Sequence, residues 1–168
     1  MPAPAHILSG YRVLDLSQVV AGPTTARLMA EMGAEVIKAE LAPDGDLGRK
    51  LPYIRAGRSA YFVQQNRGKK SVCVDVRTDA GRAVLRDLVA RVDVLVENFA
   101  PGVVARMGLD WDTVHAVNPK LVMCSISAFG QQGPMAHLPG YDYIAQAYSG
   151  FTSLTGEDGG SPYFPQLA

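Results

Sequence analysis

The hydrophobic pattern of the chain contains short continuous apolar runs, each ending at a polar turn. Such runs are typical of strands that are buried on both faces of a sheet. The predicted strands are residues 11–17, 34–40, 71–76, 93–98 and 121–127. The pattern therefore predicts a sheet that is enclosed by other elements.

Between these runs, apolar residues recur at intervals of three to four, as they do in amphipathic helices. A helix is predicted from Pro23 onward, with Leu28, Met29 and Met32 on one face and Gly33 at its end. Further helices are predicted at residues 59–66, after an N-cap at Thr78, at 102–108, after an N-cap at Asp110, and at 141–149.

Strands that alternate with helices predict an α/β fold, an open parallel sheet with helices on both faces. In such sheets, ligands bind beyond the carboxyl ends of the strands. Residues 41–58 show no clear period and predict a long loop, which in a domain of this size is often functional. The pattern contains no internal repeat and no clear domain boundary.

Composition and charge exclude several classes of partner and site for this chain. The 168 residues suit about one domain, and 16 basic residues balance 16 acidic ones, which argues against a nucleic-acid partner. The sequence contains no secretory signal pattern and no apolar run long enough to span a membrane, so we expect a cytoplasmic protein without a membrane partner. Cys73 and Cys124 lie in apolar runs and predict buried free thiols. The three histidines lack metal-ligand spacing, so no metal is expected.

Small residues follow the first predicted strand, and cationic residues precede the third. Ala21 and Gly22 have almost no side chain, so either an anion approaches the helix N-terminus there or the turn is simply tight. Arg67, Lys69 and Lys70 precede the third strand, where they are either a solvated charge run or a phosphate contact. The motifs of P-loop and dinucleotide-binding proteins are absent from the sequence.

The fourth strand end combines an amide with an aromatic ring. Asn98 and Phe99 offer one hydrogen-bonding group and one aromatic face, and Arg106 in the short helix that follows could reach a phosphate. Asp142 is either a helix cap or part of an active site. From the residues alone, the sequence predicts a phosphate-bearing ligand that binds over a parallel sheet.

Several motifs resemble, in order, those of the class III CoA-transferases, a family that includes formyl-CoA transferase, carnitine-type CoA-transferases and the related 2-methylacyl-CoA racemase. The resemblance extends from about Leu8 to Leu167, and its most specific run is ENFAPGVVARMGL. The other matching runs are LDLSQVVAGP, MGAEVIKAE, NRGKKSVCVD, NPKLVMCSISAFGQQGP, PGYDYIAQAYSG and TGEDGGSP.

The resemblance implies that residues 1–168 form an incomplete CoA-binding Rossmann-like domain. The second, smaller domain and the C-terminal return segment would be absent. In the family, two full-length chains interlock as a homodimer. One Asp attacks an acyl-CoA thioester, a mixed anhydride forms, and an aspartyl-CoA thioester then passes CoA to a carboxylate. The implied ligands are coenzyme A, as acyl-CoA, and a carboxylic acid.

Individual site residues follow from the same resemblance. Tyr141 and Asp142 would line the acyl site. The residues that the resemblance implies at the CoA site are Val19, Ala21, Gly22, Pro23, Lys69, Lys70, Asn98, Phe99 and Arg106.

The sequence departs from the family pattern at three places. The nucleophilic Asp is expected just after Ala168, so the chain alone is expected to be inactive. Racemases carry His where this chain has Tyr141, which favours a transferase, because a phenol is a poor base near neutral pH. Val20 and Leu41 replace residues typical of formyl-CoA transferase.

Two alternative functions remain open: a racemase-like isomerase, and a non-catalytic CoA- or nucleotide-binding module.

Overall fold

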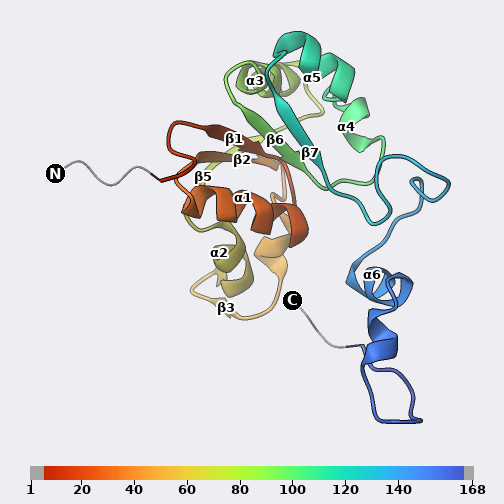
Figure 1. The fold of residues 1–168 in the computed structure, drawn as a ribbon. Helices are drawn as coiled ribbons and strands as arrows, with labels where there is room; N and C mark the ends of the chain where they lie inside the picture. Colours follow the sequence, from red (N-terminus) through yellow and green to blue (C-terminus); the bar gives the residue numbers. More distant parts are fainter. Residues whose placement is uncertain (1–5, 165–168) are drawn as a thin grey trace. The chain divides into compact units, whose positions relative to one another are not determined.

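A five-stranded parallel sheet is the centre of the computed structural model, which describes residues 6–164 (Figure 1). The strand order is β5-β2-β1-β6-β7. From β1 the chain moves outward to β2 and β5, then returns to β6 on the other side of β1, so β1 and β6 flank the topological switch point. The strands are β1 (Arg12–Asp15), β2 (Glu35–Leu41), β5 (Lys70–Val74), β6 (Val94–Glu97) and β7 (Val122–Ser125).

Helices cover both faces of this sheet, as predicted (Figure 1). On one face lie α1 (Ala21–Glu31) and α2 (Ala60–Asn66). On the other lie α3 (Asp79–Val89), α4 (Val103–Arg106) and α5 (Trp111–Val117). The two predicted N-caps are confirmed, because Thr78 accepts a hydrogen bond from the Gly81 N–H and Asp110 accepts one from the Thr113 N–H. The α/β fold with an open parallel sheet is therefore confirmed.

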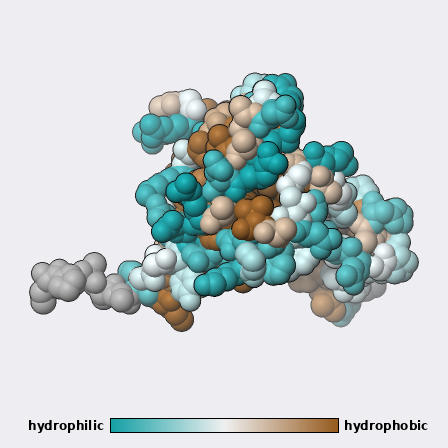
Figure 2. Space-filling model, turned by 90° about the horizontal axis from the view of Figure 1, so that it is seen from above, coloured by the Kyte–Doolittle hydropathy of each residue, from teal (hydrophilic) through white to brown (hydrophobic). Residues whose placement is uncertain are grey.

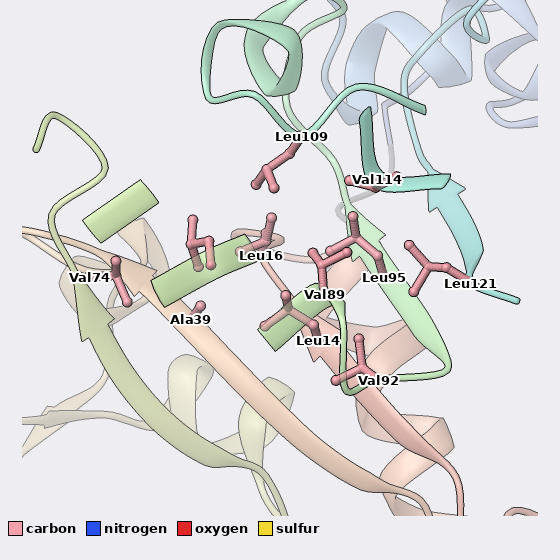
Figure 3. Packing of buried hydrophobic residues seen from close by; sticks show 11 residues of the cluster. Leu14, Leu16, Ala39, Val74, Val89, Val92, Leu95, Leu109, Val114 and Leu121 are labelled. Atoms are coloured by element: carbon pink, nitrogen blue, oxygen red, sulfur yellow. The ribbon is translucent and has the colours of Figure 1, made fainter. Parts of the chain in front are cut away.

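The larger hydrophobic core lies between the sheet and the helices α3, α4 and α5 (Figure 3). Leu14 from β1 and Leu95 from β6 are fully buried in it, together with Leu85 from α3. A smaller core on the opposite face contains Val13 and Ala26, where α1 packs on the sheet. The central strands β1 and β6 are thus fixed from both sides.

The apolar face predicted for the first helix is buried only in part. Met29 packs against the smaller core, whereas Leu28 and Met32 are 41% and 45% exposed. The fully buried positions of α1 include the small residues Gly22 and Ala26, which allow the helix backbone to approach the strands closely.

The segment predicted as a loop at 41–58 contains short regular elements. A 3₁₀ turn, η1, spans Leu47–Lys50, and a hairpin follows from β3 (Ile54–Arg55) and β4 (Arg58–Ser59). Its turn residues Ala56 and Gly57 both have positive φ, as a two-residue type I′ turn requires. Elements of two to four residues carry too little periodicity to be recognised in the sequence.

The two cysteines are free, but the prediction that both are buried is wrong. Cys124 is half-buried, and Cys73 is exposed. The physical reason is the strand order, since Cys73 lies on β5 and β5 is an edge of the sheet. An apolar run does not by itself distinguish an edge strand from a central one.

The chain divides into two compact units, one up to Ile126 and one from Ser127. The second contains α6 (Asp142–Tyr148) and η2 (Phe151–Leu154). It exposes several large apolar side chains, including Tyr141 and Leu154. In the view of Figure 2, hydrophobic surface appears as separate brown areas among larger teal ones.

That residues 1–168 form one CoA-binding domain stays a prediction. Within residues 6–164, no helix has the length and apolar character to cross a membrane.

Candidate functional site

The carboxyl edge of β1 and β6 is the candidate site, because open parallel sheets bind ligands at the topological switch point. Both strands run into loops there, and the Asn98 side chain joins the two loops. Its Oδ1 accepts a hydrogen bond from the Gln18 N–H at 2.7 Å, and its Nδ2 donates one to the Gln18 carbonyl at 2.8 Å. One amide side chain therefore satisfies both polar groups of one residue in the β1–α1 turn.

Val19, the next residue in this turn, has a φ of 66°. The left-handed region is unfavourable for a β-branched residue and costs about 1–3 kcal/mol, so surrounding contacts must hold it there. The Val19 N–H donates to Oδ1 of Asp46 at 3.1 Å. Strained backbone of this kind is often found at functional sites.

The N-terminus of α1 follows directly. Gly22 is buried, and a Cβ at this position would meet the Ser17 side chain and Cγ of Asn98, the latter at 3.4 Å. Val20, the N-cap residue, provides no side-chain cap. The first N–H groups of an α-helix lack intrahelical acceptors and favour an anion, so this turn is suited to a phosphate.

Beneath the turn lies a group of four side chains, the buried charge cluster, comprising Asp15, Lys38, Asp46 and Lys69. Each side chain is at most 1% exposed. Lys69 Nζ lies 2.7 Å from Oδ2 of Asp15, and Lys38 Nζ lies 2.9 Å from Oδ2 of Asp46 and 3.8 Å from Oδ2 of Asp15. Two cations thus compensate two carboxylates, as buried charges require.

The cluster also holds the backbone around the turn. Lys38 Nζ donates to the Ser17 carbonyl at 2.7 Å, and Lys69 Nζ donates to the Pro23 carbonyl at 2.8 Å. The Asp15 carboxylate accepts hydrogen bonds from the Ser17 N–H and hydroxyl. Strand β1, the turn and the start of α1 are therefore connected through buried ionic groups.

Sequence reasoning missed this cluster, although a signal was present. Asp15 and Lys38 interrupt apolar runs that we predicted as buried strands, and they are directly paired across β1 and β2. A charge inside a buried strand needs a partner of opposite charge. Asp46 could not be found in this way, because it lies in a segment without periodicity.

The structure separates the two lysines that were predicted together. Lys69 Nζ makes three hydrogen bonds, the third to Oδ1 of Asn66. Burial lowers the pKa of Lys69 against the attraction of Asp15, which raises it. Lys70 begins β5, its side chain is 73% exposed, and it pairs with Glu35 at 2.5 Å. The amino end of a strand is not the edge where ligands bind, so a phosphate contact by this pair stays a prediction.

Phe99 lies at the candidate edge, where β6 ends. Its N–H donates to Oε2 of Glu97, and its ring packs against the larger core. Burial raises the pKa of Glu97, while hydrogen bonds with Ser125 and Phe99 oppose this shift. Arg106 is exposed at the end of α4.

The remaining predicted residues belong to the second unit. Tyr141 is 84% exposed and precedes α6, and Asp142 accepts a hydrogen bond from Nε2 of Gln146 at 2.6 Å. The structure thus brings the β1–α1 turn together with Asn98, which Phe99 follows, whereas the two residues predicted at the acyl site belong to the second unit. The nucleophile predicted after Ala168 lies outside the described residues. Within 6–164, no group of three or more His, Cys, Asp or Glu residues is arranged to hold a metal.

A pH dependence follows from Glu40, which is buried beside the cluster. Burial would raise its pKa, but hydrogen bonds from Arg49, Ser71 and the Asp46 N–H outweigh this and lower it to about 2. Because the pKa is depressed in the folded state, the stabilisation is complete above the ordinary value of 4.5 and is lost as pH falls toward 2. We expect Glu40→Gln to flatten the dependence of unfolding free energy on pH in this window, measured by urea unfolding. An unchanged slope would contradict this assignment.

Comparison with protein families gives a match over nearly the whole chain. The family described as CoA-transferase family III matches residues 8–168. Among curated proteins, a succinate–glutarate CoA-transferase of Agrobacterium fabrum is 44% identical over 96% of this chain and 42% of its own length. A formyl-CoA:oxalate CoA-transferase of Streptomyces coelicolor is 42% identical over 94% of this chain and 38% of its own length. The chain therefore spans about two fifths of these relatives.

A solved structure agrees with this match. The chain resembles a CAIB/BAIF family protein from Brucella suis with a TM-score of 0.92 and 39% sequence identity. The similarity covers 98% of this chain and 44% of the Brucella suis protein. The fold of this chain is thus found in a protein of considerable sequence similarity.

Proposed function

The chain belongs to CoA-transferase family III, and from this premise we propose that it binds CoA at the carboxyl edge of β1 and β6. The observation that carries the proposal is the pair of hydrogen bonds between Asn98 and Gln18, which joins the loops on both sides of the switch point. They support a preformed turn in which a phosphate of CoA lies against the first N–H groups of α1.

Other residues complete this proposed site. Phe99, which is half-buried, directly follows Asn98, and Arg106 provides an exposed cation at the end of α4, the helix that follows β6 in the chain. Lys69 supports the turn indirectly, because its ammonium group donates hydrogen bonds to Oδ2 of Asp15 and to the Pro23 carbonyl. In this proposal its role is to support the turn, and Lys70 is not required.

The proposed reaction is CoA transfer between an acyl-CoA and a carboxylate, as the family resemblance implies. An Asp carboxylate attacks the thioester carbonyl, forming an acyl-aspartyl anhydride and releasing CoA thiolate. The thiolate attacks the aspartyl carbonyl, which releases the first carboxylic acid and leaves an aspartyl-CoA thioester. The acceptor carboxylate displaces CoA to form a new anhydride, and the thiolate then attacks the acceptor carbonyl, giving the new acyl-CoA and free Asp. This Asp, and a homodimer, are expected in the full-length protein.

The acceptor is proposed to be a dicarboxylate. The relatives named above act on succinate, glutarate or oxalate by their names, and a mouse succinyl-CoA:glutarate CoA-transferase is 41% identical over 96% of this chain. All three acids carry a second carboxylate. The racemase-like alternative is less favoured, because Tyr141 stands where racemases have His.

Titration calorimetry tests the proposal. CoA is expected to bind the chain, and pantetheine, which lacks the nucleotide and its phosphates, is expected to bind at least about tenfold more weakly, because the proposed contacts are made to phosphates. Equal affinity for CoA and pantetheine, or no binding of either, would contradict the proposed site.

A further inference from the structure

The segment between β2 and the β3–β4 hairpin has a role that the proposed CoA contacts leave unexplained. Its residue Asp46 is buried, although it lies in a surface connection. Oδ1 of Asp46 accepts from the Gly48 N–H at 2.8 Å and thereby caps η1. The same oxygen accepts from the Val19 N–H, which lies 27 residues earlier in the chain.

The Val19 contact is at the strained position of the β1–α1 turn. Val19 has a positive φ, which a β-branched residue adopts only when other contacts enforce it. Asn98 fixes the preceding residue Gln18 from the side of β6, and Asp46 fixes Val19 from the side of β2. The turn is thus held from both sides by side chains that are distant in sequence.

Lys38 connects Asp46 to the same turn a second time. Its ammonium group lies 2.9 Å from Oδ2 of Asp46 and donates to the Ser17 carbonyl at 2.7 Å. An ammonium group at Oδ2 leaves Oδ1 to the two backbone N–H groups. The carboxylate therefore has a fixed orientation toward Val19.

We infer that Asp46 is a positioning residue for the CoA site, which holds Val19 in the left-handed region so that the first N–H groups of α1 face the ligand. The inference rests on the proposed function. Because its side chain is 1% exposed, Asp46 acts through the turn and does not itself contact CoA. Through Asp46, the segment that follows β2 thus contributes to CoA binding.

The test compares variants of the chain by CoA titration and by hydrogen–deuterium exchange without ligand. Asp46→Ala is expected to bind CoA about tenfold more weakly, the loss of a typical hydrogen bond to a charged group. Amide exchange should accelerate in residues 17–22 and stay unchanged in β6 and α3. Asp46→Asn keeps one oxygen but turns an amide NH2 group toward either the Lys38 ammonium or the Val19 N–H, so it is expected to bind CoA more weakly than wild type but no more weakly than Asp46→Ala. Asp44→Ala is the matched control, since Asp44 lies on the same segment and pairs with exposed Lys50.

A second substitution separates positioning from general stability. Gly adopts positive φ without strain, so the double variant Asp46→Ala with Val19→Gly should bind CoA more tightly than Asp46→Ala alone. The inference is overturned if Asp46→Ala binds CoA like wild type, if Val19→Gly gives no rescue, or if exchange accelerates equally throughout residues 6–126. Failure of wild type itself to bind CoA would overturn the proposed function and this inference with it, and it is recognised before any substitution is made.

Discussion

Replacing Lys69 by Met is expected to lower the free energy of unfolding by about 3–5 kcal/mol, the usual cost of removing one partner of a buried ion pair. The Asp15 carboxylate would lose its contact at 2.7 Å and would remain buried. Lys38 cannot replace it fully, because it lies 3.8 Å away and already contacts Asp46 and the Ser17 carbonyl. Urea unfolding monitored by circular dichroism measures the change.

Lys70→Met is the matched control for this prediction. Lys70 is the next residue, but its side chain is mostly exposed, and its ion pair with Glu35 is a surface pair of little energetic value. We expect the stability of this variant to stay close to that of wild type. Similar destabilisation by both substitutions would contradict the buried role of Lys69, as would a Lys69→Met variant as stable as wild type.

Replacing Gly22 by Ala is expected to weaken CoA binding by more than about a hundredfold and to destabilise the fold by about 1–3 kcal/mol, as overpacking typically does. The added methyl group would meet the Ser17 side chain and Cγ of Asn98. Relief of this contact moves either α1 or Asn98, and both define the proposed site. Calorimetric titration with CoA measures the effect on binding.

Leu28→Ala controls for changes elsewhere in α1. Leu28 lies on the more exposed face of the same helix, so its replacement should leave CoA affinity unchanged. If Gly22→Ala binds CoA as tightly as wild type, the turn is not the place where CoA binds. If Leu28→Ala weakens binding equally, the effect of Gly22 is not specific to the turn.

Much of the fold could be predicted from periodicity because its central strands are buried on both faces. The runs around Leu14 and Leu95 are apolar for this reason, and the caps at Thr78 and Asp110 mark helix starts through local chemistry. Burial of Gly22 and Ala26 in α1 was not predicted, because close helix–sheet packing selects small residues, which a search for large apolar side chains overlooks. Edge exposure of Cys73 depends on strand order, which local sequence does not contain.

The candidate site was predictable only in part from the sequence. Gly22 and Asn98 were recognised from their place at strand ends, and the structure brings them together. The buried charge cluster was not recognised, because its members lie in β1, in β2, at the N-cap of η1 and just before β5, and only the folded chain joins them. Lys69 illustrates the difference: in sequence it belongs to a charge run, whereas in the structure it is enclosed and fully hydrogen-bonded.

The central claim is that CoA binds at the carboxyl edge of β1 and β6, and an NMR titration of the ¹⁵N-labelled chain with CoA tests it most directly. We predict that the largest amide shifts occur at Val19, Ala21, Gly22, Asn98 and Phe99, while those of Glu35 and Lys70 at the amino ends of β2 and β5 stay in place. Absence of shifts at saturating CoA, or shifts concentrated around Glu35 and Lys70, would contradict the claim.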